Sequence, residues 1–190
     1  MGDRKRCFGD GEPLMASYHD TEWGRPVHDD RELFEHLSLD IFQAGLSWRT
    51  ILNKRENFRW AFQGFDARVV ARYDQRQIER LLSDPGIVRN RLKIEATIAN
   101  AQAVLALQQE FGSFDHYLWE FTGGRTRQGP PAMRWDELPT SSSESGAMSK
   151  ALKDHGFKFV GGTICYAFMQ AVGMIDDHLA FCHRYRGAGT

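Results

Sequence analysis

The spacing of apolar residues constrains this fold most, because they recur every three or four positions through most of the chain. Over residues 90–110, one helical stripe carries Ile94, Ile98, Ala101 and Leu105. No stretch alternates convincingly with a period of two, the pattern of a half-buried strand. The sequence therefore predicts an all-α fold.

Polar residues that favour helix N-termini precede most of the predicted helices. Asp29 or Asp30 precedes a helix carrying Leu33 to Ile41, and further helices follow Ser47, Asp66, Asp74, Asn90 and Ser113. Two more are expected at about 144–155 and 163–172. Turn-forming residues fill 1–28 and 123–146, which predicts an irregular N-terminal arm and a long surface loop.

The 190 residues suit one domain, residues 1–190, with no internal repeat. No apolar run approaches a membrane span, and no apolar signal region follows the charged N-terminus. We therefore expect a cytoplasmic protein. Three cysteines, an odd number, argue against a disulfide framework. The net charge of -1 requires any nucleic-acid binding to come from a local basic face.

Residues 39–48 contain the parts of a pocket for a flat polar ring. Asp40 is an acid among apolar residues at the end of a predicted helix, and Gly45 ends that helix. Leu46 follows as an apolar protrusion, and Trp48 as a large ring. Packing in the core is the alternative role for these apolar side chains.

Cysteine and histidine occur near both ends of the chain. Cys7 and His19 lie in the arm, while His178 and Cys182 are four apart and would share one face of a helix. Two sulfur and two nitrogen ligands suit a closed tetrahedral Zn²⁺ site. Chance spacing and burial of free cysteine are the alternative, which the spacing alone favours. Cys165 is expected in the core.

A helix, a tight turn and a glycine-led helix are predicted over residues 149–172. Gly161 and Gly162 would let a phosphate approach the free N–H groups of the second helix, and Lys158 adds positive charge. An ordinary helical hairpin with solvated lysines is the alternative, and the pattern by itself favours it.

Several blocks of the sequence, taken together, resemble the bacterial 3-methyladenine DNA glycosylase I family of the helix-hairpin-helix superfamily. They are 18–24 (YHDTEWG), 43–48 (QAGLSW), 54–58 (KRENF), 156–161 (GFKFVG), 163–166 (TICY) and Asp177-His178. The resemblance covers nearly the whole chain in order. It implies a helix-hairpin-helix glycosylase fold whose two ends are joined by one structural zinc ion, with ligands at Cys7, His19, His178 and Cys182.

The resemblance also implies an activity. Such an enzyme hydrolyses the N-glycosidic bond of 3-methyladenine in alkylated double-stranded DNA, after the base has left the stack. We expect a monofunctional glycosylase without strand nicking, monomeric and acting in the cytoplasm at the nucleoid.

The site residues carried over by the resemblance surround the base. Tyr18 and Trp48 match the stacking pair, and Asp40 matches the acid that accepts hydrogen bonds from the adenine edge. Met15 and Trp23 are further pocket candidates. Leu46, beside Gly45, is the candidate for filling the gap that the base leaves, and Lys158, Gly161 and Gly162 are candidates for phosphate contact.

Two positions bear on the activity. Asp40 stands where the family carries Glu, so a damaged-DNA-binding member without catalysis, or with altered specificity, is the alternative function. Asp176, two residues before His178, matches an acid of related glycosylases that stabilises the cationic sugar. The alternative, which we favour, is that Asp176 supports His178 or caps a helix.

Overall fold

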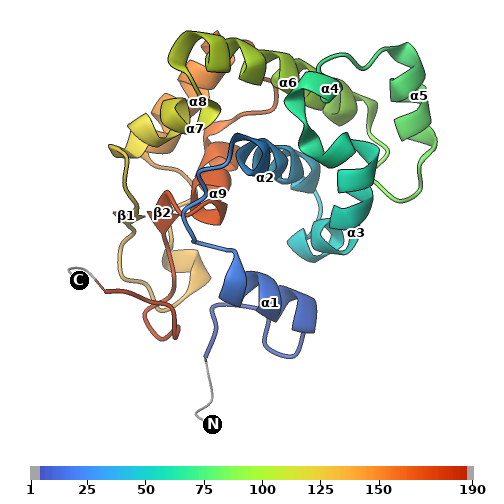
Figure 1. The fold of residues 1–190 in the computed structure, drawn as a ribbon. Coiled ribbons are helices and arrows are strands. Elements are labelled where there is room, and N and C mark those ends of the chain that lie inside the picture. Colours follow the sequence, from blue (N-terminus) through green and yellow to red (C-terminus); the bar gives the residue numbers. More distant parts are fainter. Residues whose placement is uncertain (1–4, 188–190) are drawn as a thin grey trace.

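The computed structural model describes residues 5–187 and is mostly helical, as predicted (Figure 1). The α-helices are α1 Pro13–Thr21, α2 Asp30–Gln43, α3 Trp48–Ala61, α4 Ala67–Val70, α5 Gln75–Ser83, α6 Arg91–Phe111, α7 Phe114–Trp119, α8 Ser143–Asp154 and α9 Gly162–Ala171. Short 3-10 turns occur at η1 Gln63–Phe65, η2 Glu120–Thr122 and η3 Trp135–Glu137. Two short strands, β1 Arg127–Gln128 and β2 Ile175–Asp176, pair in parallel.

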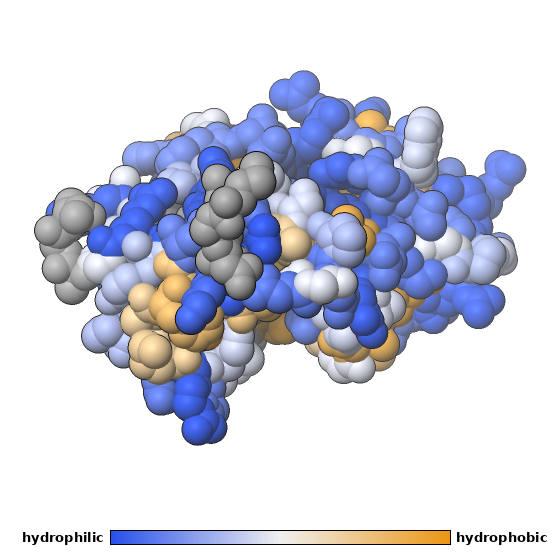
Figure 2. Space-filling view, turned by 90° about the horizontal axis from the view of Figure 1, so that it is seen from below, coloured by the Kyte–Doolittle hydropathy of each residue, from blue (hydrophilic) through white to orange (hydrophobic). Residues whose placement is uncertain are grey.

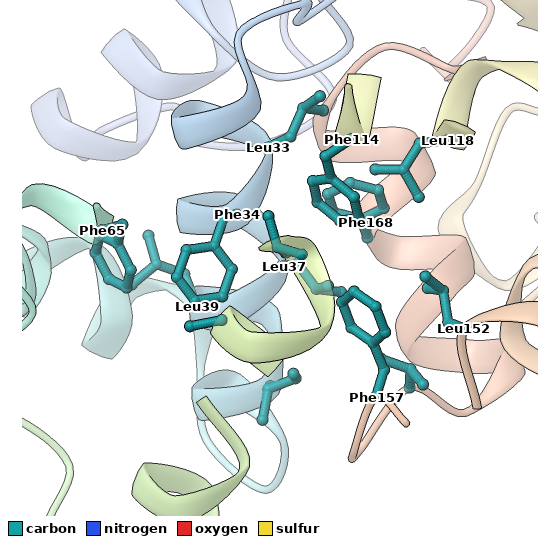
Figure 3. Close-up of a cluster of buried hydrophobic side chains, with 14 of the residues drawn as sticks. Leu33, Phe34, Leu37, Leu39, Phe65, Phe114, Leu118, Leu152, Phe157 and Phe168 are labelled. Atoms are coloured by element: carbon teal, nitrogen blue, oxygen red, sulfur yellow. The ribbon is translucent and has the colours of Figure 1, made fainter. Parts of the chain in front are cut away.

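Helix α2 is the centre of the molecule, and α3, α6, α7 and α9 pack around it (Figure 1). All its residues from Leu33 to Phe42 are buried, so it is covered on every side rather than on one stripe. Figure 3 shows its apolar side chains between Phe65 on one side and Phe114, Leu118 and Phe168 on the other. This packing brings Asp40, near the end of α2, into the interior.

The predicted caps account for most helix starts. The carboxylate of Asp29 accepts from two N–H groups of α2, and Ser47, Asp66, Asp74, Asn90 and Ser113 cap α3 to α7 in the same way. Asp30 instead accepts from the backbone N–H groups of Phe114 and Asp115 at the start of α7. The sequence left Asp29 and Asp30 as alternatives, and the fold uses both.

Two segments predicted as irregular are partly ordered. The arm contains α1, which begins at Pro13, a residue whose fixed φ suits the first helical turn. Only Tyr18 and His19 of this helix are buried, so its apolar residues form no helical stripe. The helix could therefore not be predicted from hydrophobic periodicity. The 123–146 loop contains β1 and η3. Strand β1 is ordered by its pairing with β2, almost 50 residues later in the chain. Residues before Lys5 lie outside the described part of the chain.

Both ends of the described chain lie on one side of the molecule, with α1 (Figure 1). Seen from that side, the surface is mainly hydrophilic and its apolar side chains gather in small patches (Figure 2). No helix in residues 5–187 is long and apolar enough to cross a bilayer.

Candidate active site

A cavity of about 300 Å³ lies between α1, the end of α2 and α9. It is lined by Phe8, Met15, Tyr18, Trp23, Asp40, Gln43, Trp48, Trp135, Ala167, Gln170 and Ala171. All five residues predicted for base binding are among them. The fold thus brings α1 and the 39–48 stretch together around one space.

The aromatic rings of the cavity form adjoining walls. The centroids of Tyr18 and Trp48 are 5.3 Å apart and their planes are tilted by 48°. A base held between two parallel rings needs roughly 7 Å, twice the ~3.5 Å contact distance between carbon atoms. Tyr18 and Trp48 therefore meet at a corner, and a flat ligand would lie against one ring and touch the edge of the other.

Two polar atoms of the cavity residues are buried without a partner. One carboxyl oxygen of Asp40 and the indole Nε1 of Trp48 have no hydrogen bond among the described residues. Buried polar groups are normally paired, so such atoms indicate a place for a ligand or water. Burial raises the pKa of Asp40 well above its usual range, because the surrounding apolar groups disfavour the charged carboxylate.

Sequence reasoning missed several lining residues that come from segments without a helical pattern. Phe8 packs edge-on against Trp23 with ring centroids 5.3 Å apart. The ring centroid of Trp135, from η3, lies 6.0 Å from that of Phe8, and its indole N–H donates to the Cys7 carbonyl at 3.1 Å. The 123–146 segment thus closes one wall of the cavity. Its only sequence signal was an isolated tryptophan in a polar loop.

Gln170 is a further polar lining residue that the sequence did not indicate. Its side-chain amide donates to the Asp177 carboxylate at 2.6 Å, and the Tyr166 hydroxyl donates to the same oxygen at 2.7 Å. Because the Gln170 NH₂ group is held by the buried Asp177, the orientation of its amide is fixed.

The candidate DNA-contacting residues occupy two exposed turns. Gly45, with φ +82°, ends α2 in a conformation that favours glycine, and Leu46 after it is 40% exposed. In the hairpin between α8 and α9, Lys158 is exposed. A Cβ added to Gly161 or Gly162 would meet no atom within 4 Å, so the space in front of α9 is open.

The four residues predicted as zinc ligands converge from the two chain ends. Cys7 Sγ, His19 Nε2 and Cys182 Sγ lie within 4.8 Å of one another and all three residues are buried. His178 is adjacent, with its ring centroid 5.3 Å from that of His19, and its Nε2 is buried without a partner. Residues 178–182 do not form the helix that would place His178 and Cys182 on one face: they lie in a loop with turns after β2, and this loop brings them together.

Each histidine of this cluster is oriented by an aspartate. Nδ1 of His19 lies 2.8 Å from Asp20, and Nδ1 of His178 lies 2.8 Å from Asp176. Histidines that bind metals commonly use one nitrogen for the ion and the other for a carboxylate. Burial raises the pKa of the Cys7 thiol, so a cation is needed to hold it as thiolate. The donor set fits a closed Cys₂His₂ zinc site.

Asp176 does not line the cavity. It is buried, and besides its contact with the His178 ring it accepts from the His178 backbone N–H at 3.2 Å. These contacts fit a role in supporting His178 better than a role in stabilising the cationic sugar.

Comparison with known proteins relates this geometry to a family. The sequence model of the methyladenine glycosylase family matches residues 8–185. The chain belongs to this family. It is 49% identical over 176 residues to DNA-3-methyladenine glycosylase 1 of Escherichia coli K12, covering 93% of this chain and 94% of that protein.

Solved structures of methyladenine glycosylases share the whole fold. A crystal structure of 3-methyladenine DNA glycosylase I matches with a TM-score of 0.91 and 47% identity, over 95% of this chain and 100% of the other. A variant of such an enzyme in complex with 3-methyladenine matches with a TM-score of 0.87 and 36% identity, over 92% and 95% of the two chains.

Proposed function

We propose that this protein is a monofunctional DNA glycosylase that hydrolyses the N-glycosidic bond of 3-methyladenine in alkylated double-stranded DNA. The observation that carries the proposal is the aromatic cavity with the unpartnered oxygen of Asp40 inside it, in a chain of this family. Relatives at 42% and 49% identity bear the name of this activity. Their substrate, DNA, also supports action in the bacterial cytoplasm.

In this proposal the aromatic walls bind the methylated base. Methylation at N3 gives adenine a positive charge, which is attracted by the face of the ring that the base lies against, Tyr18 or Trp48. Asp40 and the indole N–H of Trp48 provide hydrogen bonds to the edge of the base. Enclosure in the cavity requires the nucleotide to leave the stack, and the exposed Leu46 is suited to fill the resulting gap.

We propose that Asp40 acts in its protonated form, which burial favours and which suits the bond that breaks. The base loses its positive charge as it departs, so a carboxylate beside it would stabilise the bound substrate more than the transition state. A protonated acid supplies hydrogen bonds without that penalty. Water is the proposed nucleophile, because no lysine of the described residues lines the cavity to attack the sugar.

We further propose that Cys7, His19, His178 and Cys182 hold one structural zinc ion. When bound, the ion would tie the arm to the C-terminal segment, with no coordination position left for catalysis. Asp176 would then orient His178. Strong loss of excision in Asp176→Asn, with zinc content and folding intact, would instead assign Asp176 to the chemistry.

A base-release assay tests the function. Duplex DNA alkylated with a methylating agent is incubated with the protein, and the free bases are identified by chromatography. We expect release of 3-methyladenine in preference to 7-methylguanine, without strand breaks, and strong loss in Asp40→Ala. Binding to alkylated DNA without release of any base would favour the non-catalytic alternative, and full activity of Asp40→Ala would remove Asp40 from the mechanism.

A further inference from the structure

Helix α6 carries two buried polar side chains that reach away from their own helix. Lys93 is 7% exposed and Asn100 is fully buried. They are seven residues apart, which is two helical turns, so both lie on the same face about 10 Å apart along the axis. Neither residue lines the candidate cavity.

Lys93 caps the end of α2. Its ammonium group lies 2.9 Å from the carbonyl of Phe42 and 2.6 Å from the carbonyl of Ala44. The last carbonyls of a helix lack partners within the helix and form the negative end of its dipole. The last turn of α2 contains no basic residue of its own, so a lysine from another helix supplies the charge.

The carbonyls that Lys93 binds belong to the turn that presents Leu46. Ala44 directly precedes Gly45, and the exposed Leu46 follows. Within the turn, the Leu46 N–H donates to the Gln43 carbonyl at 2.7 Å, and the Gln43 amide donates to the Leu46 carbonyl at 3.2 Å. In residues 5–187 no carboxylate pairs with Lys93, so its charge is directed at this turn alone.

Asn100 holds the second exposed turn. Its side chain accepts from the Lys158 N–H at 2.7 Å and donates to the Lys158 carbonyl at 3.2 Å. This pair of bonds fixes the backbone of the α8–α9 hairpin just before Phe159, whose φ of +58° is costly for a residue with a side chain. One helix therefore fixes the backbone of both turns.

We propose that α6 fixes the position of the Leu46 turn relative to the α8–α9 hairpin, and that Lys93 is a positioning residue for base flipping. The inference rests on the proposed function. Moving a base out of the stack costs free energy, which the side chain filling the gap must help to recover. The Leu46 side chain can do this only if its turn keeps its conformation when the side chain enters the stack. The backbone of the turn must therefore be anchored to the core.

The test compares two measurements on Lys93→Met, which keeps an unbranched, flexible side chain of nearly the same length but removes its donors. Release of 3-methyladenine from duplex DNA is expected to fall roughly tenfold or more, the effect of losing hydrogen bonds from a charged group. Binding of free 3-methyladenine, followed by quenching of tryptophan fluorescence, is expected to remain unchanged, because a free base needs no flipping. A merely structural role would weaken both.

A double variant with Leu46→Ala identifies the route of the effect. If Lys93 acts through Leu46, Lys93→Met causes little further loss of excision once Leu46 has been removed. Lys54→Met is the matched control, since Lys54 also donates to two carbonyls, those of Pro85 and Gly86, in a loop outside the cavity. Lys54→Met is expected to lower stability, but not to reduce excision from duplex DNA while leaving binding of the free base unchanged.

Three outcomes would overturn the inference while the wild type remains active: unchanged excision in Lys93→Met, equal loss of excision and free-base binding, or additive effects of the two substitutions. Should Lys93→Met fail to fold, Lys93→Gln keeps an uncharged NH₂ donor group and is expected to give a smaller loss with the same selectivity. A wild-type protein that releases no base from alkylated duplex DNA refutes the proposed function itself.

Discussion

Asp40 shows at the scale of one residue how position decides chemistry. The same carboxyl group at a surface site would be ionised and hydrated. In the buried part of α2, the surroundings raise its pKa, and one of its oxygens has no partner among the described residues. It has one methylene less than the glutamate expected at this position, and it still lines the cavity. The nearby indole N–H of Trp48 is likewise available to a ligand.

Asp40 is expected to make stability depend on pH. Its pKa is raised in the folded protein, so it stays protonated where the unfolded chain is already ionised. The stability it contributes is therefore full below about pH 4, the ordinary pKa of aspartate, and is lost as pH rises toward the folded-state pKa. Asn cannot ionise, so Asp40→Asn should gain stability over the wild type progressively between acid and neutral pH.

Urea unfolding of wild type and Asp40→Asn across this range measures the difference, in which the titration of all other groups cancels. Parallel curves for the two proteins would contradict a raised pKa at Asp40.

At the scale of elements, a charged network fixes the end of α1 to the core. Arg55 of α3 donates to Glu35 of α2 at 2.6 Å and also pairs with Glu22, just after α1. Its side chain is 12% exposed and that of Glu35 only 7%. The helix that carries Tyr18 has few buried apolar residues, so these ion pairs replace part of the missing hydrophobic contact.

Arg55→Met is expected to lower the free energy of unfolding by about 2–3 kcal/mol, because it leaves a buried carboxylate with fewer donors. Arg59, which also contacts Glu35, limits the loss. Urea unfolding measures the change. The control is Arg91→Met, whose partner Glu95 is equally exposed and whose loss should cost less than about 0.5 kcal/mol. Equal effects of the two variants would contradict a structural role for the network.

At the scale of the whole molecule, the cysteine and histidine cluster joins the two ends of the chain. Leu179 N–H donates to Cys7 Sγ at 3.2 Å, a contact between residues 172 positions apart. Cross-linking such distant points removes much of the freedom of the unfolded chain. The same cluster borders the cavity, because Trp23 lies against both Phe8 and the His178 ring.

If this cluster holds zinc, chelation should act on the whole fold. A cross-link over this span is worth on the order of 5 kcal/mol, which lowers Tm by roughly 10–20 °C in a chain of this size. Calorimetry with and without chelator measures the shift, and added zinc should reverse it. Elemental analysis is the control: fewer than one zinc per chain in undialysed protein would exclude the four-ligand site.

The sequence by itself determined most of the helices and the local chemistry of this protein. Helical spacing and capping residues act over a few positions, so α2 to α7 could be read from residues such as Ser47 and Asp74. Its motif blocks indicated the family and contain three of the five predicted cavity residues, Tyr18, Trp23 and Trp48.

Only the tertiary structure decided what depends on distant contacts. It ordered α1, placed Trp135 and Gln170 in the cavity wall, and brought His178 to His19 through turns rather than a helix. It also directed Lys93 at the Leu46 turn. None of these has a local pattern, because the free energy that fixes each of them comes from groups far away in the chain.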